Sequence, residues 1–148
     1  MKQKIVLMLI GALGTLAQAQ VPSSYLCVAE KASGFAFDKR TKQWDSSTFR
    51  VSNKYLISRS KNKDFFWEVK EVGKQAADIV CTKDFNDKGN LFCGGFGSEF
   101  RFNSGSLRYM NTYFIGYWSD ANPKDKSNFM GEEGSNTPSM EIGKCSPL

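Results

Sequence analysis

The feature that most constrains the fold of this chain is a series of short apolar runs with a period of two residues. The clearest run covers residues 65–70, where Phe65, Trp67 and Val69 alternate with Phe66, Glu68 and Lys70. Similar runs recur about every 8–12 residues, separated by Gly, Asn, Asp, Ser and Lys. Helical periodicity is scarce. We therefore predict an all-β fold, an antiparallel barrel or sandwich of eight or nine strands.

The expected strands follow the apolar runs. They cover residues 25–29 with a continuation at 34–37, then 53–58, 65–70, 78–83, 90–93, 99–102, 107–109, 113–118 and 140–145. Residues 38–45 look turn-like, residues 86–89 form a hairpin turn, and residues 119–137 form a long surface loop. A short helix at 74–77 or 124–131 remains possible. The glycines at 94, 95 and 97 are expected to break or bulge the sheet.

The four cysteines indicate two disulfides, because their number is even and the chain looks exported. Three pairings are possible. We favour Cys81–Cys93, which crosses a predicted hairpin, and Cys27–Cys145, which joins the first strand to the last. A zinc site is the alternative, but the spacings of 53, 11 and 51 intervening residues contain no short C-x₂₋₄-C pair. We therefore expect no metal site.

The N-terminus has the order of a secretory signal. Residues 1–4 are basic, residues 5–16 are mainly apolar, and Ala17 and Ala19 occupy the small-residue positions before a cut at Gln20. An anchor helix needs about 20 apolar residues, more than this run supplies. We predict a signal peptide at 1–19, a single domain at 20–148 without stable membrane insertion, and a periplasmic or secreted location.

Composition excludes several functions. The chain has no histidine, which rules out Ser-His-Asp and Cys-His catalysis within it and removes the commonest transition-metal ligand. The predicted mature chain has 18 basic and 15 acidic residues once Lys2 and Lys4 are removed, a net charge of +3. The charges are interspersed, with the densest group at residues 39–42. We expect no nucleic-acid partner and no cofactor.

Two local motifs match catalytic or metal-binding signatures only in part. Residues 58–61 read S-x-x-K, but the chain lacks the S-D-N and K-T-G companions. Residues 84–89 begin like a calcium loop, yet Lys88 and Gly95 stand where an oxygen ligand and a bidentate glutamate belong. A strand end and a hairpin turn explain these residues better, so we assign no catalytic residue.

A pair of carboxylates could cleave a glycosidic bond. Glu68 and Glu99 are the best candidates, because both lie within aromatic strands. Both also alternate with bulky apolar residues, as expected of the outward face of a strand. A small carboxylate-dependent hydrolase is therefore an alternative function.

Aromatic residues give the strongest positive signal. The candidates for ligand binding are Tyr113, Tyr117, Trp118, Trp44 and Trp67. Aromatic side chains with a polar edge are favoured at binding surfaces and stack on sugars or apolar ligands. The competing interpretation is that they fill the core.

Two resemblances add to these observations. The segment 25–27 near the start and the segment 141–148 at the end resemble a set of small exported bacterial and phage-borne proteins that carries no established activity. The layout is also loosely similar to periplasmic inhibitors of C-type lysozyme, in its Tyr-x-Cys on the first strand and its cysteine on the last. This similarity implies a small β-barrel that binds lysozyme. The lipocalin Gly-x-Trp is not matched by Gly34-Phe35-Ala36.

Together these patterns predict an exported β-barrel that is not an enzyme and that binds an envelope protein or a small ligand. Lysozyme inhibition is the most concrete version of this function. The alternatives are the carboxylate hydrolase and a structural protein without a ligand.

Overall fold

The structure is a computed structural model that describes residues 22–119 and 132–148. The predicted signal peptide at 1–19 lies outside these residues, as does the possible helix at 124–131. The strands are β1 (Ser24–Asp38), β2 (Gln43–Phe49), β3 (Lys54–Arg59), β4 (Trp67–Glu71), β5 (Ile79–Cys81), β6 (Asn90–Gly95), β7 (Ser98–Asn103), β8 (Arg108–Tyr113) and β9 (Ser139–Pro147). Within the described ranges no helix occurs that could cross a membrane.

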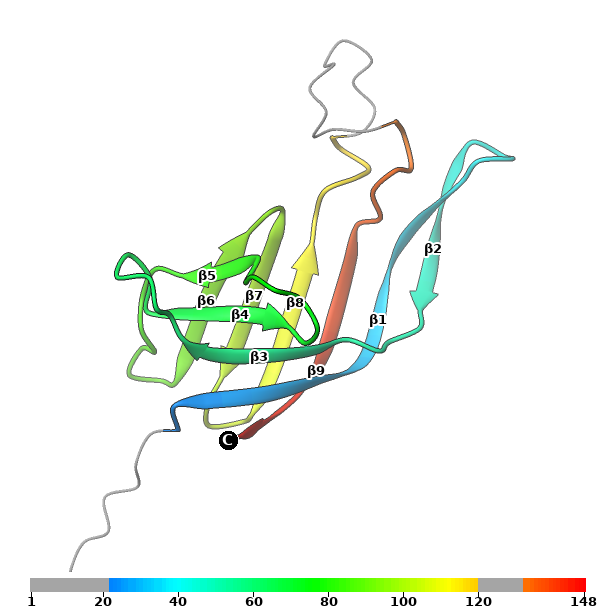
Figure 1. The fold of residues 1–148 in the computed structure, drawn as a ribbon. Helices are drawn as coiled ribbons and strands as arrows, with labels where there is room; N and C mark the ends of the chain where they lie inside the picture. Colours follow the sequence, from blue (N-terminus) through cyan, green and yellow to red (C-terminus); the bar gives the residue numbers. More distant parts are fainter. Residues whose placement is uncertain (1–21, 120–131) are drawn as a thin grey trace, which may run out of the picture.

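Eight of these strands close into an antiparallel barrel, which confirms the predicted all-β fold. The order around the barrel is β1-β3-β4-β5-β6-β7-β8-β9, and pairing of β9 with β1 completes it. In Figure 1, β3, β4 and β5 cross in front of β6, β7 and β8, and the C-terminus ends near the start of β1. Closure leaves these eight strands paired on both sides, so the barrel proper has no open edge.

The ninth strand lies outside the barrel. The first half of β1 pairs with β3, whereas its second half, from Ala32 to Asp38, pairs with β2. The resulting hairpin extends past the end of the barrel (Figure 1). Residues 38–45 were predicted as a turn, which is wrong for residues 43–45 because they belong to β2. The strand was missed because its sequence, QWDSSTF, has no regular apolar alternation. The turn itself covers only residues 39–42.

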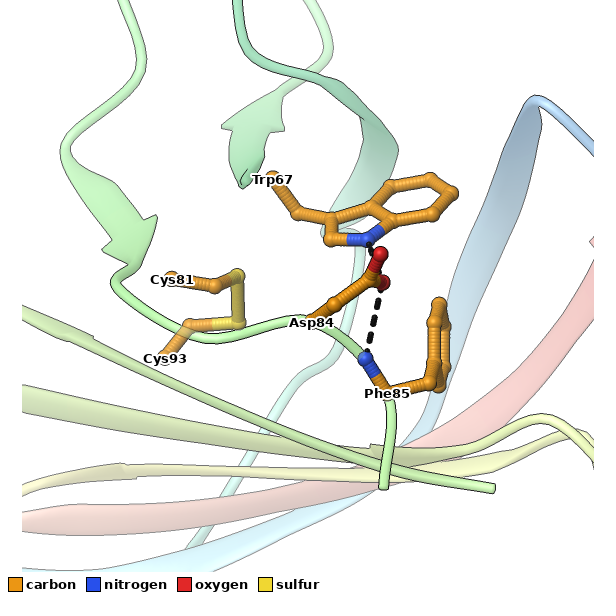
Figure 2. The surroundings of a disulfide bond; sticks show 5 residues. All are labelled: Trp67, Cys81, Asp84, Phe85 and Cys93. Carbon is orange, nitrogen blue, oxygen red and sulfur yellow. Dashed lines mark hydrogen bonds between the residues drawn. A yellow bond between two sulfur atoms is a disulfide. The ribbon is translucent and has the colours of Figure 1, made fainter. Parts of the chain in front are cut away.

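Both predicted disulfides are confirmed, and each lies at a seam of the barrel. Cys27 is the register partner of Cys145, so this bond joins the first and last strands at the closure. Cys81–Cys93 joins β5 to β6, where the ladder has a single register pair. Figure 2 shows this second bond beside the loop that leaves β5. The disulfides therefore reinforce the closing pair and the shortest pairing.

One end of the barrel is filled by aromatic side chains. Trp67 is fully buried there, and its ring lies 5.1 Å from Phe85 and 6.3 Å from Tyr25, centroid to centroid. The indole Nε1 donates a 2.7 Å hydrogen bond to Asp84 (Figure 2), and the Arg59 guanidinium lies 4.3 Å above the ring. The buried indole N–H is therefore satisfied, as a buried donor must be. We call this the closed end.

The other expectations from the sequence hold only in part. The segments expected as strands at 107–109 and 113–118 contain one strand, β8, which ends at Tyr113, and residues 114–118 form no strand. Residues 86–89 form the predicted turn, where the Gly89 amide donates to the carbonyl of Asn86. Residues 74–77, where a short helix was possible, form no helix and contain a bend at residues 75–76. The glycine-rich segment does not interrupt a strand. Instead β6 runs through Gly94 and Gly95, and the chain turns at Phe96-Gly97 into β7.

Candidate functional site

The barrel interior changes from apolar to polar along its strands. Side chains on alternate residues share a face. From the closed end upward, the inward residues of β8 are Tyr109, Asn111 and Tyr113, and those of β9 pass from Cys145 to Glu141. The same change from apolar to polar occurs on two other strands. The inward residues are Phe102, Phe100 and Ser98 on β7, and Ile57 and Tyr55 on β3, with Asn53 just before β3. The opposite end of the barrel is therefore lined by polar side chains, and we call it the polar end.

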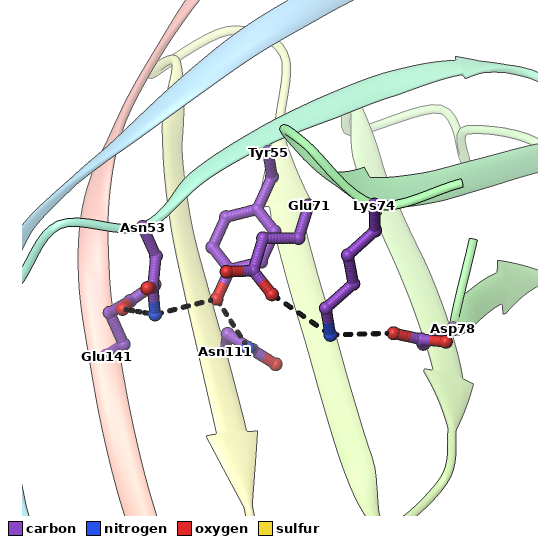
Figure 3. A network of polar contacts seen from close by, with 7 residues as sticks. All are labelled: Asn53, Tyr55, Glu71, Lys74, Asp78, Asn111 and Glu141. Carbon is purple, nitrogen blue, oxygen red and sulfur yellow. Dashed lines mark hydrogen bonds and ion pairs between the residues drawn. The ribbon is translucent and has the colours of Figure 1, made fainter. Parts of the chain in front are cut away.

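A buried carboxylate organises the polar end. Glu141 is 7% exposed, and its Oε1 accepts a 2.9 Å hydrogen bond from the Tyr109 hydroxyl. Its Oε2 accepts a 2.8 Å bond from Asn53 Nδ2, which also lies 3.3 Å from the Tyr55 hydroxyl oxygen (Figure 3). Burial and the negative charge of Glu141 raise the pKa of Tyr55 to about 12, and burial followed by the bond to Glu141 raises the pKa of Tyr109. Both phenols stay neutral at physiological pH.

Asn111 is the one member of this network with an unmet hydrogen-bonding atom. Its Nδ2 donates to the Tyr55 hydroxyl at 3.3 Å. Its Oδ1 is buried and is the only buried side-chain polar atom in residues 22–119 and 132–148 without a hydrogen-bond partner. An unmet buried acceptor costs about 1–3 kcal/mol, so its presence needs an explanation.

Lys74 joins two carboxylates at the rim of the polar end. Its Nζ lies 3.0 Å from Glu71 and 2.9 Å from Asp78 (Figure 3). The hydrogen bond to Asp78 and then that to Glu71 raise the pKa of Lys74 to about 12. The ammonium is therefore already matched by two anions, and these three groups together carry a net charge of −1.

These side chains surround a cleft with two hollows. The larger hollow has a volume of about 400 Å³ and includes the Lys74 group, Phe96 and Ser98. The smaller has a volume of about 180 Å³ and includes Asn53 and Glu141. Tyr55, Asn111 and Tyr113 line both hollows. We call the two hollows together the polar cleft.

The five aromatic candidates from the sequence lie in three different places. Trp67 is in the core at the closed end and is 0% exposed. Tyr113 lines the polar cleft, where its hydroxyl donates to Asn136 Oδ1 at 3.0 Å. Trp44, Tyr117 and Trp118 lie outside the barrel. The sequence candidates are therefore not one site.

Trp44 and Tyr117 meet beside the hairpin formed by β1 and β2, although 73 positions separate them in the chain. The Trp44 ring contacts Phe37, its register partner on β1, at 5.4 Å and Tyr117 at 5.8 Å between centroids. Trp118 follows Tyr117, and its Nε1 donates a 2.7 Å bond to the carbonyl of Phe114. Tyr117 and Trp118 are 64% and 66% exposed. We call Phe37, Trp44, Tyr117 and Trp118 the aromatic cluster.

Two residues of the long loop fix the position of this cluster. Glu133 Oε1 accepts a 3.1 Å hydrogen bond from Trp44 Nε1. Gly134 has φ of +79°, and a Cβ at this position would lie 2.5 Å from the Phe37 ring. A glycine is needed here on both conformational and steric grounds. The described part of the long loop, residues 132–137, is therefore packed against the hairpin.

The turn beside the cluster is basic. Lys39, Arg40 and Lys42 lie in the turn between β1 and β2, and all three are exposed. The backbone N–H groups of Arg40 and Thr41 bond to the Asp38 carboxylate and lower its pKa. The turn thus places three cations and one anion at the end of the hairpin, next to exposed aromatic rings.

The two candidate catalytic carboxylates lie far apart on the outer face. The ladders place Glu68 opposite Val80, Val80 opposite Gly94 and Gly94 opposite Glu99. Three interstrand steps of about 4.8 Å separate the two strands by roughly 14 Å. Glycosidases hold such a pair about 5–9.5 Å apart. Glu99 pairs with Arg101 at 3.0 Å, so Glu68 and Glu99 do not form a glycosidase pair.

The polar cleft was not identified from the sequence. Tyr55, Lys74, Asn111 and Glu141 lie in strands or turns that read as ordinary alternation. One available signal is the polar residue at an inward position, such as Asn111 two residues after Tyr109. A single polar inward residue does not identify a site. Only the register of the strands shows that several such residues lie at the same end of the barrel.

Comparison with family models, with curated proteins and with solved structures gave no match for this chain.

Proposed function

We propose that this protein is an exported binding protein that holds an acidic partner protein of the cell envelope through its aromatic cluster. The observation that carries the proposal is the exposure of Tyr117, whose ring contacts Trp44 beside Phe37, and of Trp118, the next residue in the chain. Exposed aromatic groups of this kind mark interaction surfaces in soluble proteins. Trp and Tyr are also the residues that contribute most to protein interfaces.

The tip of the hairpin beside the cluster is basic and favours an acidic partner at that point. The exposed Lys39, Arg40 and Lys42 lie in the turn at residues 39–42, whereas Asp38, Asp45 and Glu133 lie next to the rings themselves. Complementary charge speeds encounter and selects partners more than it adds affinity. The two disulfides fit an oxidising compartment, which supports a partner outside the cytoplasm.

The anchoring of the cluster supports binding without rearrangement. Trp44 is hydrogen-bonded to Glu133, and Phe37 packs over Gly134, so two of the four rings are already ordered. Preordered side chains lose less entropy when a partner binds. The cluster lies off the barrel, so changes in it are expected to leave the barrel core intact.

The test is capture from an envelope extract by the oxidised protein, compared with a Tyr117→Ala/Trp118→Ala variant. We expect an acidic protein that the variant loses at least tenfold, because each ring removed from an interface centre costs about 1–2 kcal/mol or more. Phe92→Ala is the matched control, since Phe92 is also an exposed aromatic residue but lies on β6. Equal capture by all three proteins would exclude the aromatic cluster.

A second variant tests the charge argument. Changing Lys39, Arg40 and Lys42 together to Gln is expected to slow association and to weaken its dependence on salt, while dissociation changes little. Surface plasmon resonance with the captured partner measures both rates. Association that is unchanged in the triple variant would count against an acidic partner.

Lysozyme inhibition is tested in the same preparation. C-type lysozyme activity is measured with the protein in molar excess. Inhibition would contradict the acidic partner, because C-type lysozymes are basic proteins. Activity that stays at its full value removes the lysozyme-inhibitor alternative.

A further inference from the structure

We propose that the polar cleft is a second binding site, and that its ligand is a neutral saccharide. The site lies inside the polar end of the barrel and shares no residue with the aromatic cluster. The inference therefore does not depend on the partner protein proposed above.

The size of the cleft suits a small ligand. The larger hollow, at about 400 Å³, falls in the lower part of the roughly 300–1,000 Å³ range of small-molecule sites. The smaller hollow continues it past Tyr55, Asn111 and Tyr113, which line both. A one-ring or two-ring molecule fits such a space.

Asn111 indicates a ligand that carries hydroxyl groups. Its buried Oδ1 has no donor among the described residues, and Asn111 lines both hollows. A ligand hydroxyl donates to an amide oxygen, and it also accepts from an amide NH₂. A ligand hydroxyl therefore pairs with the side-chain atom of Asn111 that lacks a partner, whether that atom is the oxygen or the nitrogen of the amide.

The charges in the cleft disfavour ionic ligands. Lys74 in the larger hollow is bound to Glu71 and Asp78, and the smaller hollow adds one cation, Arg50, and one carboxylate, Glu141. The described lining of the whole cleft therefore carries a net charge of −1, which disfavours an anion. The carboxylates are in turn matched by Lys74, and Glu141 is occupied by Asn53 and Tyr109, which leaves no unpaired carboxylate for a cation.

Phe96 supplies a surface for a sugar ring. It is 70% exposed, it lines the larger hollow, and its φ is +48°. With Gly97 at φ +76° it forms a two-residue hairpin turn between β6 and β7, in which Asn, Asp or Gly normally takes the first position. A phenylalanine held in this strained conformation at the edge of a cleft points to a function for its ring.

Saccharides combine these properties. They present hydroxyl groups around the ring edge and an apolar C–H face that packs on an aromatic side chain. The cleft offers Asn111 and Ser98 for the hydroxyl groups and Phe96 for the apolar face. A purely apolar ligand would leave Asn111 unsatisfied.

The test is calorimetric titration of the oxidised protein with glucose, galactose, mannose and their disaccharides. Glucuronic acid and glucosamine serve as the anionic and cationic probes. We expect a neutral sugar to bind better than both charged probes, and we expect the side-chain amide signal of Asn111 to shift in ¹⁵N–¹H NMR spectra. Tighter binding of either charged probe, or binding without a shift of Asn111, would overturn the proposal.

Two variants separate binding from folding. Phe96→Asn places the favoured Asn-Gly pair in the turn, so we expect a melting temperature equal to or above that of the parent, with about tenfold weaker sugar binding. Asn111→Leu removes the unmet polar atom at nearly constant volume, and we expect it to abolish binding while the barrel stays folded.

Phe92→Ala is the control, because Phe92 is an exposed phenylalanine of β6 that does not line the cleft. Binding that is unchanged in Phe96→Asn and Asn111→Leu would exclude the cleft. If no sugar binds while the acidic partner is still captured, the saccharide proposal fails and the proposed function stands.

Discussion

At the residue scale, the most demanding position is Trp67. Trp67 is the largest residue in the core, and its indole carries a polar N–H. Burial of this N–H requires a hydrogen-bond acceptor close to it. Asp84 supplies that partner from the loop after β5, and it also bonds to Arg59 and to the N–H of Phe85. Burial opposes ionisation of Asp84, but these three bonds outweigh it and lower its pKa. A single carboxylate therefore joins the core, a strand and a loop.

Asp84→Ala is expected to destabilise the protein by about 1–3 kcal/mol, because it leaves the Trp67 indole N–H buried without an acceptor. Asp84→Asn keeps an acceptor and is expected to cost less. Chemical denaturation of both variants measures the free energies of unfolding. If Asn were as damaging as Ala, the charge of Asp84 rather than the hydrogen bond to Trp67 would dominate.

Gly134 sets the position of the aromatic cluster. Gly134→Ala places a Cβ against Phe37 in a left-handed backbone conformation, so the segment must move away from the hairpin. We expect a loss of about 1–2 kcal/mol locally and a change in tryptophan fluorescence as Trp44 separates from Tyr117. The Trp44→Phe variant identifies the Trp44 signal. Fluorescence that is identical in the parent and Gly134→Ala would show that Gly134 does not order the cluster.

At the element scale, the two disulfides have different tasks. Cys27–Cys145 spans 118 positions and closes the barrel, whereas Cys81–Cys93 spans 12 and supports the short β5–β6 pairing. A crosslink that closes a longer loop removes more entropy from the unfolded chain. The closing disulfide should therefore contribute more to the stability of the whole barrel.

Loop-closure entropy gives about 5 kcal/mol for the Cys27–Cys145 bond and about 3 kcal/mol for the Cys81–Cys93 bond. Replacing each pair by two serines, one pair at a time, tests the order of these values by urea denaturation. We expect the Cys27→Ser/Cys145→Ser variant to be the less stable. The reverse order would mean that local support of β5 and β6 matters more than closure.

At the scale of the whole molecule, the barrel has an aromatic closed end and a polar end with ionisable groups. Its stability is therefore expected to depend on pH on both sides of neutrality. On the acid side, the lowered pKa of Asp84 stabilises the fold above the ordinary pKa of about 4, and this stabilisation is lost as the pH falls through the lowered value.

On the alkaline side, the pKa values of Tyr55 and Lys74 are raised to about 12. Their contribution is complete below the ordinary pKa values of about 10 and is lost as the pH rises toward 12. We expect the urea midpoint to be flat near neutrality and to fall below about pH 4 and above about pH 10.

Two variants assign the two branches. Asp84→Asn is expected to flatten the acid branch, and Tyr55→Phe to reduce the alkaline one. Ultraviolet titration of the tyrosines checks the second assignment independently, because the loss of Tyr55 should remove a late-titrating phenol. A pH profile that is unchanged in both variants would contradict these assignments.

Much of the barrel was predictable from the sequence. Alternation in residues such as Trp67 and Val69, or Phe100 and Phe102, correctly identified inward positions, since the pleat sends alternate side chains to one face whatever the partner strand. The favoured pairing of the cysteines, based on a predicted hairpin and on the first and last strands, was also confirmed. By contrast, β2 was missed, because its polar sequence is held in a strand only by pairing with β1.

The sequence by itself therefore determined most of the strands and their inward faces, because these depend on local alternation, and it favoured the cysteine pairing that the structure shows. Only the tertiary structure brought Trp44 to Tyr117, and Asn111 to Tyr55 and Lys74. Such contacts depend on strand register and on closure of the barrel, which join residues far apart in the chain. Alternation states which side of a strand a residue faces, but closure decides which residues it meets there.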